Sequence, residues 1–172
     1  MFRRFRRRGG RMSDGDSDGA AAARGPESHV REAMRLAEEA AAAGNRPFGA
    51  VVVDAHGVVV VRERNRVAEW RDPLAHAEIN AIRAACRAAG TVTLTGFRLY
   101  TNAAPCAMCL SAMVIAGIAV VGYGAPREPG TVPAVGVAEL ASRSGPNRIE
   151  IQSDLVRAEA VAQLKRLTGT AT

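Results

Sequence analysis

The sequence predicts an α/β fold of three layers, in which helices cover both faces of a five-stranded mixed sheet. Two β-branched runs at 49–54 and 58–62 are separated by three residues that include a glycine, which indicates an antiparallel hairpin. After this hairpin, strand-like and helix-like segments alternate, and such alternation is typical of parallel strands with helices packed on both faces. One hairpin followed by parallel crossovers predicts a mixed sheet.

Each element is indicated by its own residue pattern. Apolar residues at helical spacing, followed by a glycine, indicate a helix, and short runs of β-branched residues between glycine-rich or polar turns indicate a strand. Helices are expected at 27–43, 76–89, 105–116 and 134–143, with a last helix from about 153 to 167, and further strands at 97–101, 118–123 and 148–152.

Length and charge indicate one domain with two tails. The 172 residues suffice for one core, which we expect at 27–168, with a short tail at 169–172. The net charge of +6 is carried by six arginines in residues 1–11, so the rest of the chain is neutral. Residues 12–26 are small and polar, and we expect 1–26 to be disordered.

Three features of the composition bear on partners and location. A neutral domain lacks the positive surface that nucleic acids require. No run of 18 apolar residues is present, so no membrane span is expected. Three cysteines provide no disulfide framework, which favours a reducing cytoplasm.

His76, Cys106 and Cys109 are the candidate metal ligands. A catalytic zinc takes three nitrogen or sulfur ligands from the protein and leaves a fourth position for water. Cysteines three residues apart lie on one side of a helix, and Pro105 fits the first turn of such a helix. Cys106 would then lie near the positive end of the helix dipole, where a thiolate is favoured. The sequence therefore predicts one zinc ion per chain.

Glu78 is the candidate proton carrier. Residues two apart within a helix point to nearly opposite sides, roughly 200° apart. His76 and Glu78 converge only where a helix begins, and Pro73 indicates such a boundary. A redox pair or half of a structural zinc knuckle would also explain Cys-x-x-Cys. Neither needs a distant His-x-Glu, and a zinc-stabilised binding module that has lost catalysis would not need Glu78.

These motifs resemble the cytidine-deaminase-like superfamily of zinc deaminases, and within it the purine branch of guanine deaminases and tRNA adenosine deaminases. The resemblance covers about residues 46–167, and its strongest segments are 46–50, 72–83 and 105–109. It implies a cytidine-deaminase-like fold, hydrolytic deamination by zinc-bound hydroxide with release of ammonia, and a homodimer.

The resemblance also implies substrate contacts. In the family an asparagine at the position of Asn65 commonly hydrogen-bonds the substrate, and the same residue also suits an ordinary turn. Backbone groups at Ala77 and at Pro105, where the cysteine helix starts, are implied to hold the ring. Phe48 is similar to the residue of guanine deaminases at its position. Trp70 precedes the zinc motif and fits either a pocket rim or the core.

A guanine-type nucleobase is the expected small-molecule substrate, which would place the protein in purine metabolism. The alternatives are the adenosine of a tRNA, and cytosine or cytidine. Residues 79–90 are similar to guanine deaminases, whereas 123–125 and 149–167 look more like tRNA adenosine deaminases. Ala104 stands where the purine branch usually has glutamate. No aromatic residue follows Tyr123, so the lid of guanine deaminases cannot be transferred to this chain.

Overall fold

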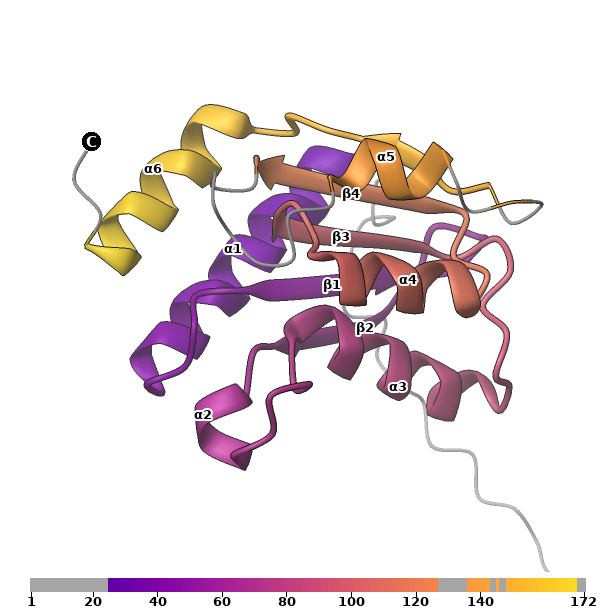
Figure 1. Ribbon diagram of the computed structural model, residues 1–172, viewed down its shortest axis with the longest axis horizontal. Coiled ribbons are helices and arrows are strands. Elements are labelled where there is room, and N and C mark those ends of the chain that lie inside the picture. The colour runs from indigo at the N-terminus through magenta and orange to yellow at the C-terminus, as the bar shows by residue number, and fades with distance from the viewer. Residues whose placement is uncertain (1–24, 127–135, 143–144, 146–147, 170–172) are drawn as a thin grey trace, which may run out of the picture.

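The computed structural model describes residues 25–126, 136–142, 145 and 148–169, which build a twisted sheet between two layers of helices (Figure 1). Most of the tail expected to be disordered at 1–26 lies outside the described residues. Residues 127–135 and 170–172 also lie outside the described residues. The first two residues of the helix expected at 134–143 are among them.

The elements follow one another in an order that agrees with the prediction, with one short helix added. Among the described residues, no helix is both long enough and apolar enough to cross a bilayer. The elements are α1 (Pro26–Ala42), β1 (Gly49–Val53), β2 (Val59–Arg64), α2 (Val67–Trp70), α3 (Ala77–Ala89), β3 (Arg98–Ala103), α4 (Ala107–Ile115), β4 (Val120–Ala125), α5 (Val137–Ser142), β5 (Glu150–Gln152) and α6 (Arg157–Thr168).

The five strands form one mixed sheet, as expected, and their order in it is β2-β1-β3-β4-β5. Strand β1 pairs antiparallel with β2 in the hairpin and antiparallel with β3 on its other side. Strands β3, β4 and β5 are parallel. Because β1 opposes both of its neighbours, β2 and β3 run in the same direction although they do not touch. This direction decides where the functional site lies.

Alternate residues of the central strands face the two helical layers. Val52 and Leu99 belong to the core cluster that α3 and α4 cover, whereas Val51 and Tyr100 pack in the cluster under α1. Helix α6 covers β4 on the same side as α1 (Figure 1). All five residues of β1 are buried, as is typical of a strand with helices on both faces.

Two local differences from the expected elements have physical causes. Helix α2 has four residues, too few to show a helical period in the sequence. Its Trp70 is 52% exposed and lies under the Arg66 guanidinium, 5.2 Å from the ring centroid, so it is not a core residue. Ser153 precedes the last helix without capping it, because Asp154 and Val156 adopt positive φ angles before α6 begins.

Prediction for the contact between α1 and β1: Gly49→Ala should lower the free energy of unfolding by about 1–3 kcal/mol, as overpacking does in other cores. A Cβ atom at Gly49 would overlap the carbonyl oxygen of Ala33 and lie 2.7 Å from Leu36 Cβ. Chemical denaturation measures the change. Gly136→Ala is the control, because a Cβ there meets no atom within 4 Å. Equal midpoints for wild type and Gly49→Ala would contradict this packing.

Candidate zinc site

Two helix starts at one edge of the sheet bring the predicted metal ligands together. His76 is the N-cap residue of α3, and Cys106 is the N-cap residue of α4, with Cys109 in its first turn. Helix α3 follows β2 and helix α4 follows β3. Since β2 and β3 run in the same direction, both helices begin at the edge formed by the carboxyl ends of these strands, where α/β proteins commonly place their sites.

The three ligand atoms have the spacing that a zinc ion needs. His76 Nδ1 lies 3.7 Å from Cys106 Sγ and 3.5 Å from Cys109 Sγ, and the two sulfur atoms are 3.5 Å apart. Zinc–sulfur bonds of about 2.3 Å and zinc–nitrogen bonds of about 2.0–2.1 Å in a tetrahedron would separate the sulfurs by about 3.8 Å and the nitrogen from each sulfur by about 3.6 Å. One histidine and two cysteines at this spacing fit zinc.

Hydrogen bonds within this cluster favour the thiolate form of Cys106. The hydrogen bond with Cys109 lowers the pKa of the Cys106 thiol to about 4, and the contact with His76 acts in the same direction. The same hydrogen bond is the main cause that raises the pKa of Cys109, and burial of the thiol acts in the same direction. The hydrogen bond with Cys106 raises the pKa of His76. Cys106 is therefore ready to act as a metal ligand at neutral pH.

Glu78 is a buried carboxyl group next to these ligands. Its residue is 6% exposed, and it lies close enough to His76, Cys106 and Cys109 for each of them to shift its pKa. Burial raises the pKa of Glu78 above its usual range, because the charged form loses contact with water. The helix start resolves the geometric conflict seen in the sequence: His76 has extended dihedral angles, φ −65° and ψ 151°, so it and Glu78 need not point in opposite directions.

Of the residues expected to contact substrate, Asn65 and Phe48 lie in segments that are hydrogen-bonded to each other. The Asn65 N–H donates to the Phe48 carbonyl oxygen at 2.9 Å, and Phe48 is half-buried against the core cluster that Cys106 also contacts. Ala77 and Pro105 are buried at the starts of the two helices. The Asn65 side chain is fully buried, and its Nδ2 has no hydrogen-bond partner among the described residues.

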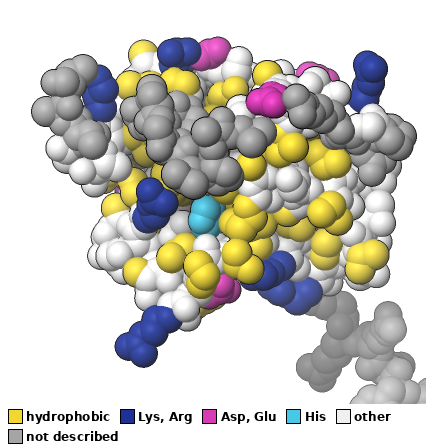
Figure 2. All heavy atoms as spheres, in the orientation of Figure 1, with side chains coloured by type: hydrophobic (Ala, Val, Ile, Leu, Met, Phe, Trp, Pro, Cys, Tyr) yellow, Lys and Arg dark blue, Asp and Glu magenta, His cyan; other side chains and the backbone are white. Residues whose placement is uncertain are grey.

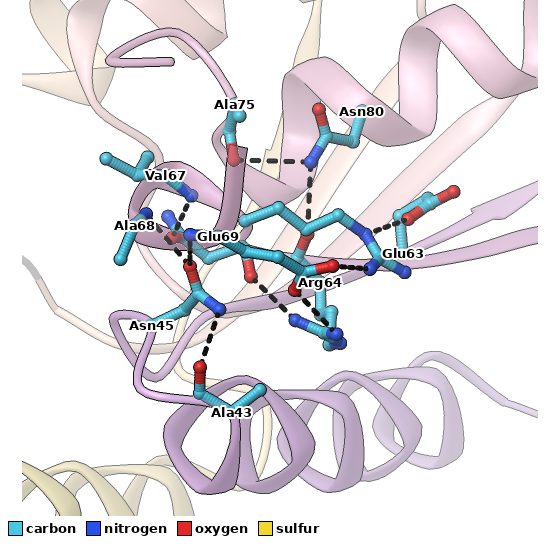
Figure 3. Close-up of polar contacts among 11 residues, drawn as sticks. Ala43, Asn45, Glu63, Arg64, Val67, Ala68, Glu69, Ala75 and Asn80 are labelled. Carbon is cyan, nitrogen blue, oxygen red and sulfur yellow. Dashed lines mark hydrogen bonds and ion pairs between the residues drawn. The ribbon is translucent and has the colours of Figure 1, made fainter. Parts of the chain in front are cut away.

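Two buried asparagines with structural roles were missed by the sequence analysis. Asn102 Oδ1 accepts from the Gly49 N–H, and its Nδ2 donates to the Pro47 carbonyl, both at 3.0 Å. It thereby fixes the turn that carries Phe48. Asn45 Oδ1 accepts from the N–H groups at the start of α2, as Figure 3 shows. Asn102 directly follows the strand predicted at 97–101, where an asparagine also suits a turn, so no pattern in the sequence indicated its buried contacts.

A mixed α/β sheet with a histidine, two cysteines and a buried carboxyl group at its edge defines a zinc-binding deaminase fold. The sequence profile described as "Cytidine and deoxycytidylate deaminase zinc-binding region" matches residues 24–125, more than half of the chain. The protein belongs to this family, whose guanine and tRNA adenosine deaminases are zinc hydrolases that act on C–N bonds.

Relatives with two different substrates are about equally similar. A tRNA-specific adenosine deaminase of Aquifex aeolicus (strain VF5) is 40% identical over 94 residues, which are 55% of this chain and 62% of the relative. Guanine deaminase of Bacillus subtilis (strain 168) is 42% identical over 100 residues, which are 58% of this chain and 64% of the relative. The matched part of the chain therefore spans less than two thirds of either relative.

A solved structure is similar over more of the chain. It comes from biochemical and structural studies of A-to-I editing by tRNA:A34 deaminases, and it superimposes with a TM-score of 0.70 at 35% identity. The superposition covers 80% of this chain and 99% of that one. Similarity thus identifies the family and leaves the substrate to be argued from the site.

Prediction for the metal: the purified protein should contain one zinc ion per chain, and Cys106→Ser should lose most of it. Serine keeps the size of the side chain but removes the thiolate ligand. Inductively coupled plasma mass spectrometry on the dialysed protein measures the content. Cys86→Ser is the matched control, because Cys86 lies later on α3 and is not part of the cluster. Equal zinc loss in both variants would contradict the ligand assignment.

Proposed function

We propose that this protein is a zinc-dependent hydrolase that deaminates a nucleobase or a related amino-heterocycle, with a guanine-type base as its substrate. The observation that carries the proposal is Glu78, a buried carboxyl group beside the ligand set. A zinc ion that only stabilises the fold has four protein ligands and no open position for water, so it needs no proton carrier. A binding module without catalysis therefore explains the site less well.

The proposed reaction is hydrolysis of a C–N bond. Water adds to the ring carbon that bears the exocyclic amine, the bond from that carbon to the amine breaks, and the products are the ring carbonyl and ammonia. Zinc supplies Lewis acidity that brings the pKa of water near neutrality. The Glu78 carboxylate takes one proton from the water and delivers it to a ring nitrogen, and then carries the second proton from the hydroxyl group of the adduct to the leaving amine, so both protons of the water are used. The raised pKa of Glu78 favours its holding that proton.

Four further residues are proposed to hold the ring. The Nδ2 group of Asn65 is a buried donor without a partner among the described residues, which suits a ring carbonyl or nitrogen of the substrate. The N–H groups in the first turn of a helix lack intrahelical partners, so the backbone at Ala77 can donate to the substrate. Phe48 and Pro105 would supply apolar contacts beside the ring, since Pro105 directly precedes Cys106 and Phe48 packs against the core cluster that Cys106 also contacts.

The charges around the site favour a small base over a tRNA. Arg64 and Arg66 each form an ion pair with Glu69 at 2.8 Å, and Arg83 lies 3.9 Å from Asp72. Their charges are offset by carboxylates, and the chain beyond the first eleven residues is neutral. Binding of a phosphate backbone depends on unbalanced positive charge. The tRNA adenosine deaminases remain the second candidate class, because relatives named for that activity are equally similar.

Prediction for the proton carrier: Glu78→Gln should keep its zinc and reduce kcat by about 10²–10⁴-fold, the usual contribution of general acid–base catalysis. Glutamine has the same size but cannot take a proton at neutral pH. Ammonia release under steady-state conditions measures kcat, and the metal content is determined on the same sample. Turnover at the wild-type rate in Glu78→Gln would refute the role of this residue.

Prediction for the substrate: of guanine, adenine, cytosine, amino-triazines, their nucleosides and an unmodified tRNA, guanine should release ammonia with the highest kcat/KM. Coupled detection of ammonia compares the small molecules. Inosine content after digestion of the RNA reports on tRNA. Exclusive reaction with tRNA would overturn the charge argument and identify the second candidate class.

We also propose that the protein is a cytoplasmic homodimer. Helix α4 contains no charged residue, and a helix that is apolar on all sides is normally buried. Yet Ile115, at its end, is 82% exposed, and Leu74, ahead of α3, is 48% exposed. Figure 2 shows hydrophobic side chains gathered over α3 and α4, the kind of surface that a second copy covers.

The proposed cytoplasmic location rests on the cysteines. Thiol ligands such as Cys106 suit a reducing compartment.

Prediction for the assembly: Ile115→Glu should shift the protein from dimer to monomer, because a charge would be buried without a partner in the proposed interface. Sedimentation velocity at several concentrations measures the change. Val58→Glu serves as the control, since Val58 is also exposed, at 57%, but lies in the turn between β1 and β2. A dimer that tolerates Ile115→Glu would exclude α4 as its interface.

A further inference from the structure

A single buried side chain joins the segment before the metal ligand His76 to the segment before Asn65. Asn80 lies on α3 and is 4% exposed. Its Nδ2 donates to the carbonyl oxygen of Arg64 at 3.1 Å and to that of Ala75 at 3.2 Å, as Figure 3 shows. Arg64 directly precedes Asn65 in the chain, and Ala75 directly precedes His76.

Both of these carbonyl groups lie where regular structure ends. Strand β2 ends at Arg64, and α3 begins only at Ala77, so the chain between them is held by individual contacts. The Ala75 oxygen also accepts from the Arg66 N–H at 3.0 Å. The Asn80 amide therefore joins the two ends of the loop that contains α2. In its contact with the Arg64 carbonyl, no backbone N–H of α3 takes its place.

The geometry at the site is sensitive to this link. His76 Nδ1 must stay near 3.5–3.7 Å from both sulfurs, and the direction of its ring is set by the backbone at its junction with Ala75. Asn65 accepts the Val67 N–H at 3.1 Å through Oδ1, and its Nδ2 is a donor without a partner in the part of the chain that the structure describes. A shift of the Arg64 carbonyl would move this donor relative to the metal ligands.

We propose that Asn80 is a positioning residue that fixes the distance and orientation between His76 and Asn65. Its amide holds the backbone on both sides of the loop, so its loss loosens the imidazole ligand and the Asn65 donor together. Zinc affinity and substrate affinity should therefore both fall. The part that concerns zinc stands on the ligand geometry alone, whereas the part that concerns substrate rests on the proposed function.

The test compares Asn80→Ala with Asn45→Ala. Asn45 is also buried, at 7% exposed, and it also holds the loop through two backbone contacts, to the N–H groups of Ala68 and Glu69 at 3.0 and 3.1 Å. It is bonded to neither Arg64 nor Ala75. Both variants should unfold at a lower temperature than the wild type. Only a loss of zinc affinity that occurs in Asn80→Ala and not in Asn45→Ala therefore indicates a positioning role.

Zinc affinity is measured by competition with a chromophoric chelator. We expect Asn80→Ala to bind zinc about 10–100-fold more weakly, the usual loss when a group that supports a metal ligand is removed. Asn45→Ala should bind zinc as the wild type does. The visible absorption spectrum of the cobalt(II)-substituted protein gives a second readout, because distorted ligand geometry changes it in Asn80→Ala but not in the control. Unchanged zinc affinity and spectrum in Asn80→Ala, or equal changes in both variants, would overturn the proposal.

Asn80→Ser extends the test if the alanine variant does not fold. Serine keeps one hydroxyl donor but is too short to bond to both carbonyl groups, so Asn80→Ser should bind zinc more weakly than the wild type, and wild-type affinity in Asn80→Ser would also overturn the proposal. With the best substrate of the panel, KM should rise more than kcat falls in Asn80→Ser. Weaker zinc binding with unchanged KM would refute the link to Asn65 alone. Absence of turnover in the wild type would refute the proposed function and leave the zinc result standing.

Discussion

The site depends on one topological constraint, which is that two helices start at the same edge of the sheet. His76 and Cys106 are both N-cap residues, and each lies in the connection after a strand. These strands, β2 and β3, are separated by β1, which opposes both of them. If β3 ran the other way, α4 would begin at the far edge and Cys106 could not approach His76. Three ligand atoms within 4.8 Å of one another are the result.

Buried asparagines hold the irregular segments that this arrangement requires. Asn102 ties the turn around Phe48 to β3, Asn45 supplies the first N–H groups of α2 with an acceptor, and Asn80 joins the two ends of the loop that contains α2. An amide serves this purpose because it carries both donors and acceptors without a charge. Loops around a metal site have few backbone partners of their own, so such amides add hydrogen bonds to their carbonyl and N–H groups.

The departure from the purine branch at Ala104 leaves the metal ligands in place. The Ala104 N–H donates to the Ala125 carbonyl at 2.8 Å, which continues the contact between β3 and β4 toward Cys106. Its half-buried methyl group packs against the core cluster of α3 and α4. A small apolar residue here needs no ionic partner.

The sequence by itself determined the class of fold, the ligand types and the candidate proton carrier. Local patterns suffice for these: β-branched runs mark strands, Pro105 marks a helix start, and the spacing of Cys106 and Cys109 places both thiols on one side of that helix. Only the tertiary structure decided that β2 and β3 run in parallel on either side of β1, and that Asn45, Asn80 and Asn102 are buried in contact with distant backbone. Such contacts join residues up to 55 positions apart. No local pattern encodes them, because an asparagine is equally common in an exposed turn and its partners here are carbonyl and N–H groups that every residue has.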